Sequence, residues 1–350
     1  MSHQWLQRVV LYTWLLWTVH ADKHRPGTRL AAPKADGCEV GEKYEIREPP
    51  IYSICLHPEG DMISDFIRSS GHWMDCDEYP AMTMEGVLLD IGRSAELGAA
   101  VTGLRRLSAS SALSHYLSGV VVDVGANIGS CAFDLAQLGH RVYAFEFQRD
   151  NYERMRSTKK LNNFKGGIDI FNVLVSSESK PHITVASDIN SKNMGAQGAR
   201  EVSRSLLGVK QQVSLSAMRL DDAVNRHVNF MKLDCQGCEY AALLGAEKIF
   251  QDHGVDLLYM EFSPPSMASA SGKPKAAEDT LHMLLKYGMD IWVRNHKYVS
   301  GKGMTTLNST ADVLKFMKDA PFKVMPDEEM DVYAIRSGTI FPSSILGMIS

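Results

Sequence analysis

Residues 120–133 read VVVDVGANIGSCAF, and this stretch decides the fold that we predict for the chain. An apolar run containing Asp123 ends at Gly125, and Gly129 comes directly before a segment that looks helical. A glycine turn between a strand and a helix offers backbone N–H groups to a ligand. The turn is similar to a dinucleotide-binding turn, but Asn127 replaces the central glycine and Asp123 adds a negative charge.

Strand and helix patterns alternate through the rest of the chain, which is typical of a parallel sheet covered by helices. We expect strands at residues 119–125, 141–147, 167–177, 229–235, 255–262, 289–295 and 329–337, and helices at 130–139, 150–164, 221–225, 239–254 and 276–288. Two further strands, 181–187 and 211–220, bracket a polar loop that either closes over a substrate or only connects a hairpin. The predicted fold class is α/β, with a Rossmann-like doubly wound, mostly parallel sheet and its ligand site at the carboxyl ends of the strands.

The chain divides into five predicted parts. They are a signal peptide or signal-anchor (1–21), a linker or stem (22–36), an N-terminal cap region (37–118), the α/β domain (119–337) and a C-terminal tail (338–350). The apolar core from Val9 to Val19 is shorter than the roughly 20 residues of a membrane span, and Val19 and Ala21 fit cleavage before Asp22. A cleaved signal or a retained anchor predicts the secretory pathway (the ER or Golgi lumen, a single-pass membrane protein or a secreted one). An organelle-targeting segment is the third reading.

Composition excludes some classes of partner. The 350 residues carry a net charge of −4, so no basic excess indicates nucleic acid. We predict no metal, because capping of a short helix explains the pair Asp221 and Asp222. The sequence indicates no oligomeric state.

Six cysteines allow fifteen complete pairings, so their connectivity does not follow from the sequence. A Cys55–Cys76 bridge would suit an oxidising compartment. The Cys235–Cys238 pair lacks the second pair of ligands that a structural zinc needs. It either replaces small residues in a turn or forms a local disulfide. One glycosylation sequon begins at Asn308.

Asp123 and Glu146 indicate the charge of the ligand. Asp123 beside the turn would repel a diphosphate and suit S-adenosylmethionine, which carries a cationic ammonium and a sulfonium. Glu146 ends the second strand, where a carboxylate accepts hydrogen bonds from both ribose hydroxyls. Two alternatives stay open, namely ordinary capping or surface charge for the two carboxylates, and a nicotinamide site.

Four stretches of the chain resemble the FkbM-type methyltransferases. They are VVDVGANIGS, FEFQRDN, the segment from LDDAV to NFMKLDCQGCEYAALLGA, and LLYMEFSP. The third is similar to the family's K-x-D-x-E-G-x-E segment through Lys232, Asp234, Gly237 and Glu239. The resemblance implies a class I methyltransferase fold for 119–337 and methyl transfer from S-adenosylmethionine, typically to an oxygen. The cofactor-binding residues it implies are Asp123, Gly125, Asn127, Gly129, Glu146 and Asn151.

Two residues depart from the family's pattern. Phe147 replaces a proline, which changes the stiffness of a loop, and Gln236 replaces a glutamate. An amide at 236 could hold geometry but could not act as a base.

Methyl transfer to a hydroxyl needs a group near the methyl that removes the proton. Asp234 and Glu261 follow strands that end beside that spot, and they are the predicted catalytic residues. In the alternative, Asp234 binds the amino end of the cofactor and Glu261 is structural. We therefore predict an S-adenosylmethionine-dependent methyltransferase acting on a glycan, lipid or small molecule. The alternatives are a catalytically weakened cofactor-binding pseudoenzyme and an NAD-dependent oxidoreductase.

Overall fold

The structure is a computed structural model, and it describes residues 38–39, 41–46, 51–71, 119–187, 199–201, 212–295, 305–319 and 330–337. The chain divides into two units, Met1–Lys34 and Ala35–Ser350, and the second contains all of these residues. The predicted signal or anchor, the whole predicted linker, residues 72–118 of the predicted cap region and the C-terminal tail lie outside the described residues.

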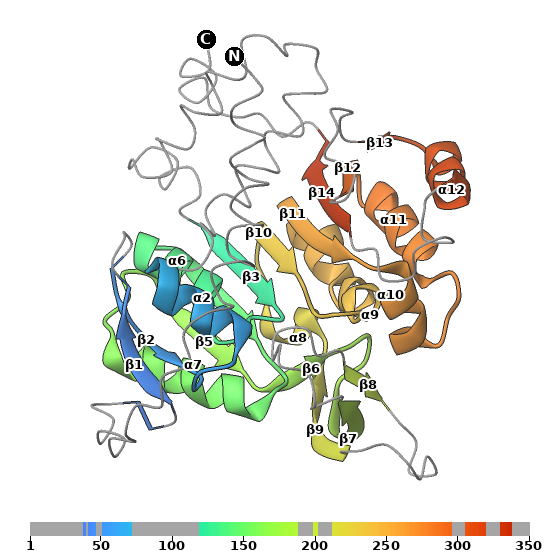
Figure 1. The fold of residues 1–350 in the computed structure, drawn as a ribbon. Coiled ribbons are helices and arrows are strands. Elements are labelled where there is room, and N and C mark those ends of the chain that lie inside the picture. Colours follow the sequence, from blue (N-terminus) through green and yellow to red (C-terminus); the bar gives the residue numbers. More distant parts are fainter. Residues whose placement is uncertain are drawn as a thin grey trace, which may run out of the picture. The chain divides into compact units, whose positions relative to one another are not determined.

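An eight-stranded sheet forms the centre of the domain (Figure 1). In spatial order its strands are β13 (Thr305–Leu307), β12 (Met289–Asn295), β14 (Met330–Arg336), β11 (Val255–Phe262), β10 (Val228–Leu233), β3 (Val120–Val124), β4 (Arg141–Phe145) and β5 (Ile168–Phe171). The five strands from β11 to β5 are parallel, and β14, β12 and β13 join them as antiparallel strands. This order confirms the predicted Rossmann-like, mostly parallel sheet of the class I methyltransferase type.

Helices cover both faces of the sheet (Figure 1). One face packs against α8 (Leu220–Ala223), α9 (Glu239–Leu244), α10 (Pro264–Ser271), α11 (Ala276–Lys286) and α12 (Thr310–Asp319). The other face packs against α2 (Met62–Ser70), α6 (Ser130–Leu138) and α7 (Arg149–Leu161). Alternating residues of each strand therefore enter two separate apolar cores, as expected for a doubly wound sheet.

A second sheet of four strands begins where the predicted strand 167–177 divides. Its strands, in spatial order, are β6 (Val173–Val175), β9 (Gln212–Met218), β7 (Lys180–Ser187) and β8 (Ala199–Glu201). Asn172 separates β5 from β6, and its Nδ2 donates hydrogen bonds to the carbonyls of Glu146 and Phe147, both at 2.9 Å. The chain thus changes sheets at Asn172. The predicted antiparallel pairing of 181–187 with 211–220 is confirmed as β7 with β9.

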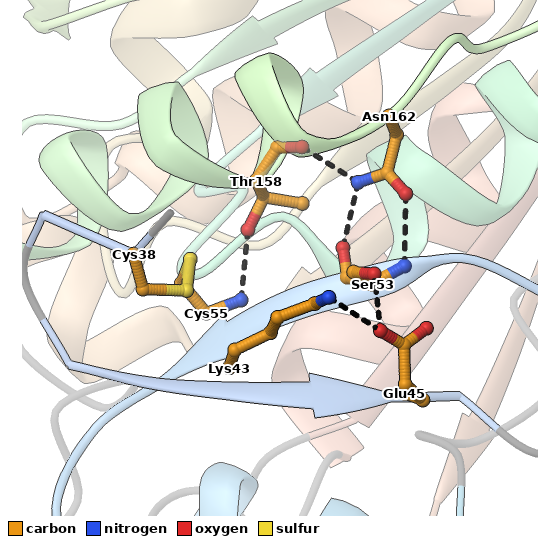
Figure 2. The surroundings of a disulfide bond; sticks show 7 residues. All are labelled: Cys38, Lys43, Glu45, Ser53, Cys55, Thr158 and Asn162. Carbon is orange, nitrogen blue, oxygen red and sulfur yellow. Dashed lines mark hydrogen bonds and ion pairs between the residues drawn. A yellow bond between two sulfur atoms is a disulfide. The ribbon is translucent and has the colours of Figure 1, made fainter. Parts of the chain in front are cut away.

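A small hairpin precedes the main sheet in sequence and docks on α7 (Figure 2). It pairs β1 (Glu42–Glu45) with β2 (Ser53–Leu56). The Ser53 N–H donates to Asn162 Oδ1 at 2.8 Å, and Asn162 Nδ2 returns a bond to the Ser53 carbonyl at 2.7 Å. The Cys55 N–H donates to Thr158 Oγ1 at 2.9 Å. Polar side chains of a helix therefore take the place of a further strand along β2.

The predicted Cys55–Cys76 bridge is wrong, because Cys55 forms a disulfide with Cys38 (Figure 2). The hairpin places the chain before β1 beside β2, so that the two Cα atoms lie 5.8 Å apart. A second disulfide joins Cys235 to Cys238, which is the local bridge left open by the sequence. Cys131 is also disulfide-bonded.

Several helices differ from those predicted. The segment predicted as one helix over 239–254 contains α9, which ends at Leu244, and a π-helical turn at Ile249–His253. Gly245 follows the helix, and a Cβ at this position would lie 2.3 Å from the Ser176 carbonyl oxygen, so the chain passes too close to the Ser176 backbone for any other residue. Helices α10 and α12 were not predicted. Within the described part of the chain, no helix combines the length and the apolar character that crossing a bilayer requires.

Candidate active site

The glycine turn between β3 and α6 lies at the carboxyl edge of the parallel strands. The N–H groups of Gly125 and Ala126 both donate to the Phe145 carbonyl, at 3.0 and 3.1 Å, which ties the turn to β4. A Cβ on Gly125 would lie 1.8 Å from the Asp234 carbonyl oxygen, so only glycine fits there. Asn127 has a positive φ of 56°, and its side-chain Oδ1 is buried without a hydrogen-bond partner. Gly129 begins α6 at a φ of 86°.

Glu146 follows β4 and is 4% exposed. Its Oε2 accepts a hydrogen bond from the Asn127 N–H at 2.8 Å, and its Oε1 accepts one from the Gln148 N–H at 2.7 Å. Burial raises the pKa of Glu146 to about 7, although these hydrogen bonds act in the opposite direction. Each oxygen retains a lone pair, so the carboxylate can accept further donors from a ligand.

Lys232 lies between two carboxylates. Its Nζ is 3.4 Å from Asp123 Oδ1 and 3.1 Å from Asp234 Oδ2. Burial raises the pKa of Asp123, whose Oδ2 is buried and has no hydrogen-bond partner. Burial also acts to raise the pKa of Asp234, but the charge of Lys232 and hydrogen bonds with Glu261, Lys232 and Gln236 outweigh it and lower that pKa. Asp234 is therefore held ionised.

The Gln236 side chain joins the ends of β10 and β11. Its Nε2 donates to Glu261 Oε2 in a short hydrogen bond and to Asp234 Oδ1 at 3.5 Å. The backbone of Gln236 has a positive φ of 58°. An ionised glutamate at this position could donate to neither neighbour, and a protonated one has a single O–H and could donate to only one, so the amide has a role here that the family's glutamate could not fill completely.

The loop that carries Gln236 is fixed from two sides. The Cys235–Cys238 disulfide closes it, and the Glu239 carboxylate accepts from the Cys235 and Gly237 N–H groups at 3.1 and 3.2 Å. A Cβ on Gly237 would lie 2.7 Å from the Ser266 carbonyl oxygen, so the loop also packs closely on α10. Burial raises the pKa of Glu239 to about 7.

These elements enclose a pocket of about 420 Å³ that is open to solvent. The lining residues are Val124, Gly125, Asn127, Phe145, Glu146, Phe147, Gln148, Val173, Leu174, Val175, Asp234, Cys235, Gln236 and Cys238. Two of them are acidic and none is basic, so the described wall favours a cationic ligand over a diphosphate.

The structure brings the predicted residues together, but only some of them line the pocket, and the others are buried behind its wall. Gly125, Asn127, Glu146 and Asp234 line the pocket. Asp123 lies beneath the residues that line the pocket and is 1% exposed. It is paired with Lys232, whose positive charge offsets much of the negative charge that a ligand in the pocket would otherwise experience.

The other predicted residues lie behind the lining. Gly129 starts α6, where a Cβ would meet the Phe133 ring at 2.5 Å. Asn151 is fully buried in the first turn of α7. Glu261 reaches the site through its bond to Gln236.

Sequence reasoning missed the apolar wall. The three residues of β6 line the pocket, and so does Phe147, which also packs against Ile183 and Ala217 of the second sheet. Substitution of the family's proline by Phe147 thus adds an aromatic contact. An apolar run predicts a strand, but no local pattern indicates that the strand leaves the main sheet and faces the ligand site.

Among the described residues, no three His, Cys, Asp or Glu side chains lie together as a metal site would require.

The site and sheet order define an α/β methyltransferase domain of class I. A family model for the methyltransferase FkbM domain matches residues 123–324, more than half of the chain. The chain therefore belongs to the FkbM methyltransferase family. None of the curated proteins compared with it matches.

Two solved structures show similarity to the chain. The first is methyltransferase FkbM from Methylobacillus flagellatus KT, with 13% identity and a TM-score of 0.37 over 78% of this chain and 60% of that one. The second is magnesium protoporphyrin IX methyltransferase from Synechocystis PCC 6803 with bound SAM, with 14% identity and a TM-score of 0.32 over 69% of this chain and 81% of that one. The chain thus spans 60% of the length of the first structure.

S-adenosylmethionine is the cofactor of this type of domain, and the residues of the pocket fit it. Glu146 has free lone pairs for ribose hydroxyls, and the apolar side chains beside it suit an adenine ring. Asn127 lines the pocket, and its buried side-chain oxygen, which has no hydrogen-bond partner, can accept a donor.

Proposed function

We propose that this chain transfers the methyl group of S-adenosylmethionine to an oxygen atom of an acceptor in the secretory pathway. The observation that carries the proposal is the pair of carboxylates, Asp234 and Glu261, which the Gln236 amide joins at the edge of the pocket. S-adenosylmethionine supplies an electrophilic methyl on a sulfonium. A hydroxyl that accepts it has a proton to lose, and a carboxylate within reach can take that proton.

The two carboxylates have different roles in this proposal. Asp234 is held ionised by Lys232 at 3.1 Å, which makes it a weak proton acceptor. A hydrogen bond between Asp234 and Glu261 needs one proton, and this proton belongs on Glu261 because Lys232 keeps Asp234 ionised. Glu261 can act as a base when both carboxyls are ionised, and the proton that it takes from the acceptor then forms the hydrogen bond to Asp234. Glu261 is therefore the general base, and Asp234 orients the acceptor hydroxyl.

The disulfides support the proposed compartment. Cys38–Cys55 and Cys235–Cys238 are bonded, and Cys131 is disulfide-bonded as well. Disulfides persist in oxidising compartments and are rare in the cytosol. Entry through the N-terminal signal or signal-anchor remains a prediction. Glycans, lipids and small molecules met in a lumen offer hydroxyl acceptors, and the pocket is open to solvent.

Transfer of isotope-labelled methyl tests the proposal. The purified protein is incubated with methyl-labelled S-adenosylmethionine and with separated glycan, lipid and small-molecule fractions of a cell-surface and secretory-pathway extract. We expect label in a methyl ether or methyl ester, identified by mass spectrometry. Glu261→Gln should lower the rate about 100-fold or more, because general-base catalysis contributes about 10²–10⁴-fold. Glu247→Gln, at an exposed carboxylate away from the pocket, is the matched control.

Two outcomes would contradict the proposal. Label found on nitrogen or sulfur would exclude oxygen as the acceptor atom. Cofactor binding without transfer to any fraction would favour the weakened cofactor-binding protein.

A further inference from the structure

Three buried polar side chains connect the N-terminal hairpin to the cofactor carboxylate. His57 directly follows β2, Asn151 lies in the first turn of α7, and Glu146 follows β4. His57 Nε2 is 2.6 Å from Asn151 Oδ1, across 94 residues of sequence. The exposed fractions of His57, Asn151 and Glu146 are 6%, 0% and 4%, so water competes little with these contacts.

The Asn151 amide has one favourable orientation in this group. Its Nδ2 makes no hydrogen bond within the usual geometric limits, and Glu146 is the carboxylate whose pKa the amide lowers. When Glu146 is ionised it only accepts hydrogen bonds, so the amide orientation that suits both neighbours turns the NH₂ end toward Glu146 and the oxygen toward His57. His57 Nε2 therefore carries the proton. The donors point in a single direction, from His57 to Asn151 to Glu146.

The hairpin and α2 fix the position of the imidazole. The His57 N–H donates to Ser64 Oγ at 3.0 Å, and the His57 carbonyl accepts from Arg68. Asp61 caps α2 by accepting from the Ser64 N–H at 2.9 Å. The His57 backbone is thus held by two residues of one helix, and its side chain is aimed at Asn151.

We propose that His57 is a positioning residue for the cofactor: it orients the Asn151 amide, which holds the Glu146 carboxylate ready for the ribose hydroxyls. The inference rests on the use of S-adenosylmethionine in the proposed function, and it adds a residue from outside the methyltransferase domain. The N-terminal hairpin thereby takes part in cofactor binding without touching the cofactor.

The pKa of Glu146 depends on the orientation of the Asn151 amide and can therefore be used to test the proposal. The groups facing Glu146 are Asp123, whose charge acts to raise its pKa, and the N–H groups of Asn127 and Gln148 with the Asn151 amide, which act to lower it. Removal of the oriented amide should therefore raise the pKa of Glu146 beyond about 7.

Titration of His57 itself leaves the link intact. The charged groups facing His57 are Arg154, Asp61 and Asp150, and burial is the main reason that its pKa is lowered. The neutral Nε2–H tautomer and the imidazolium both donate from Nε2. A change in the pH dependence of cofactor binding would therefore come from the titration of Glu146 and not from that of His57.

The experiment measures the affinity of the full protein for S-adenosylmethionine and its demethylated product by calorimetry between pH 6 and 9. His57→Leu should weaken binding about fivefold to tenfold at neutral pH and move the pH midpoint upward, as expected for the loss of one buried hydrogen bond. His57→Gln should restore affinity, because its amide can donate to Asn151. Thr158→Val is the matched control, since Thr158 anchors the same hairpin through the Cys55 N–H (Figure 2) and is not part of the His57–Asn151 contact.

The outcomes separate this inference from the proposed function. Unchanged affinity in His57→Leu overturns the inference, and so does equal weakening in Thr158→Val, which would show that only docking of the hairpin matters. His57→Asn, whose shorter amide keeps polarity but loses reach, replaces His57→Leu if that variant does not fold. Failure of the wild type to bind either ligand contradicts the proposed function instead.

Discussion

At the scale of single residues, the site contains non-glycine residues with a left-handed backbone conformation. Asn127 and Gln236 are the non-glycine residues with positive φ among those that the structure describes, and both line the pocket. The left-handed conformation costs about 1–2 kcal/mol for a residue with a Cβ. Such strain persists where surrounding contacts over-determine it. At Asn127 the contact is to Glu146, and at Gln236 it is to two carboxylates.

The first prediction concerns the donor at position 236. Gln236→Glu should destabilise the protein by about 1–3 kcal/mol at pH 8, because an acceptor-only group then lies against Glu261 and Asp234. The loss should shrink at pH 5, where the new carboxyl can carry a proton and donate. Urea unfolding at both pH values measures this. Gln236→Met removes the donor without adding charge, so its loss of stability should be similar at pH 5 and pH 8. If the stability loss of Gln236→Glu were the same at both pH values, the bridging role of Gln236 would be contradicted.

The second prediction concerns cofactor binding and Glu146. Because burial raises the pKa of Glu146 to about 7, the apo carboxyl is largely protonated at pH 6 and ionised at pH 8. Affinity for S-adenosylmethionine should therefore rise from pH 6 to pH 8. Glu146→Gln should bind at least about tenfold more weakly at pH 8 and lose this pH dependence. Calorimetry at fixed ionic strength is the measurement; a flat pH profile in the wild type would refute this account.

The third prediction uses Glu239, which is 1% exposed and has one oxygen without a partner. Its folded pKa of about 7 lies above the ordinary glutamate value of 4.5, so the native state binds more protons than the unfolded state between these two pH values. Its contribution to stability is thus complete below about pH 4.5 and is lost as pH rises through about 7. Glu239→Gln should raise the free energy of unfolding at pH 8 by about 1–3 kcal/mol. Thermal unfolding of the apo protein checks this, and a destabilised variant at pH 8 would show that the ionised form is needed.

At the scale of elements, the two disulfides close loops of different length. Cys38 and Cys55 are 17 residues apart and join the hairpin, whereas Cys235 and Cys238 are three apart and close one turn. Loop-closure entropy gives about 3 kcal/mol for the first and about 2 kcal/mol for the second.

Paired alanine variants test this fourth prediction. Cys38→Ala/Cys55→Ala should lose more stability than Cys235→Ala/Cys238→Ala in denaturant unfolding. The second pair should instead reduce methyl transfer, since it releases the loop that holds Gln236. A larger stability loss from the second pair would contradict the entropic account.

At the scale of the whole molecule, the sequon provides a test of the compartment. Asn308 is exposed, and Ser309 with Asp312 caps α12 directly after it. If the chain enters the secretory pathway, Asn308 is open to glycosylation.

The fifth prediction is that the protein from mammalian secretory expression loses mass on treatment with an N-glycosidase. Thr310→Ala should abolish the shift, whereas Ser309→Ala keeps the sequon and should preserve it. A wild-type protein without glycan would count against lumenal exposure of this face.

Much of the fold followed from local pattern. The glycine turn, the parallel strands and the acidic residue after β4 were predicted correctly, because side-chain period and glycine placement act over a few residues. The break at Asn172 was not predicted, since it depends on carbonyls 25 and 26 residues away. The end of α9 was missed for a similar reason, because Gly245 meets the Ser176 backbone.

The sequence by itself determined the class of the sheet, the position of the ligand site at its carboxyl edge and the acidic residues around it. The tertiary structure decided what those residues do. It pairs Asp123 with Lys232, 109 residues away, joins Cys55 to Cys38, and sets His57 against Asn151. The physical reason is range: strand and turn preferences arise between neighbours in the chain, whereas ion pairs, disulfides and buried hydrogen bonds depend on which distant segments the packed core brings together.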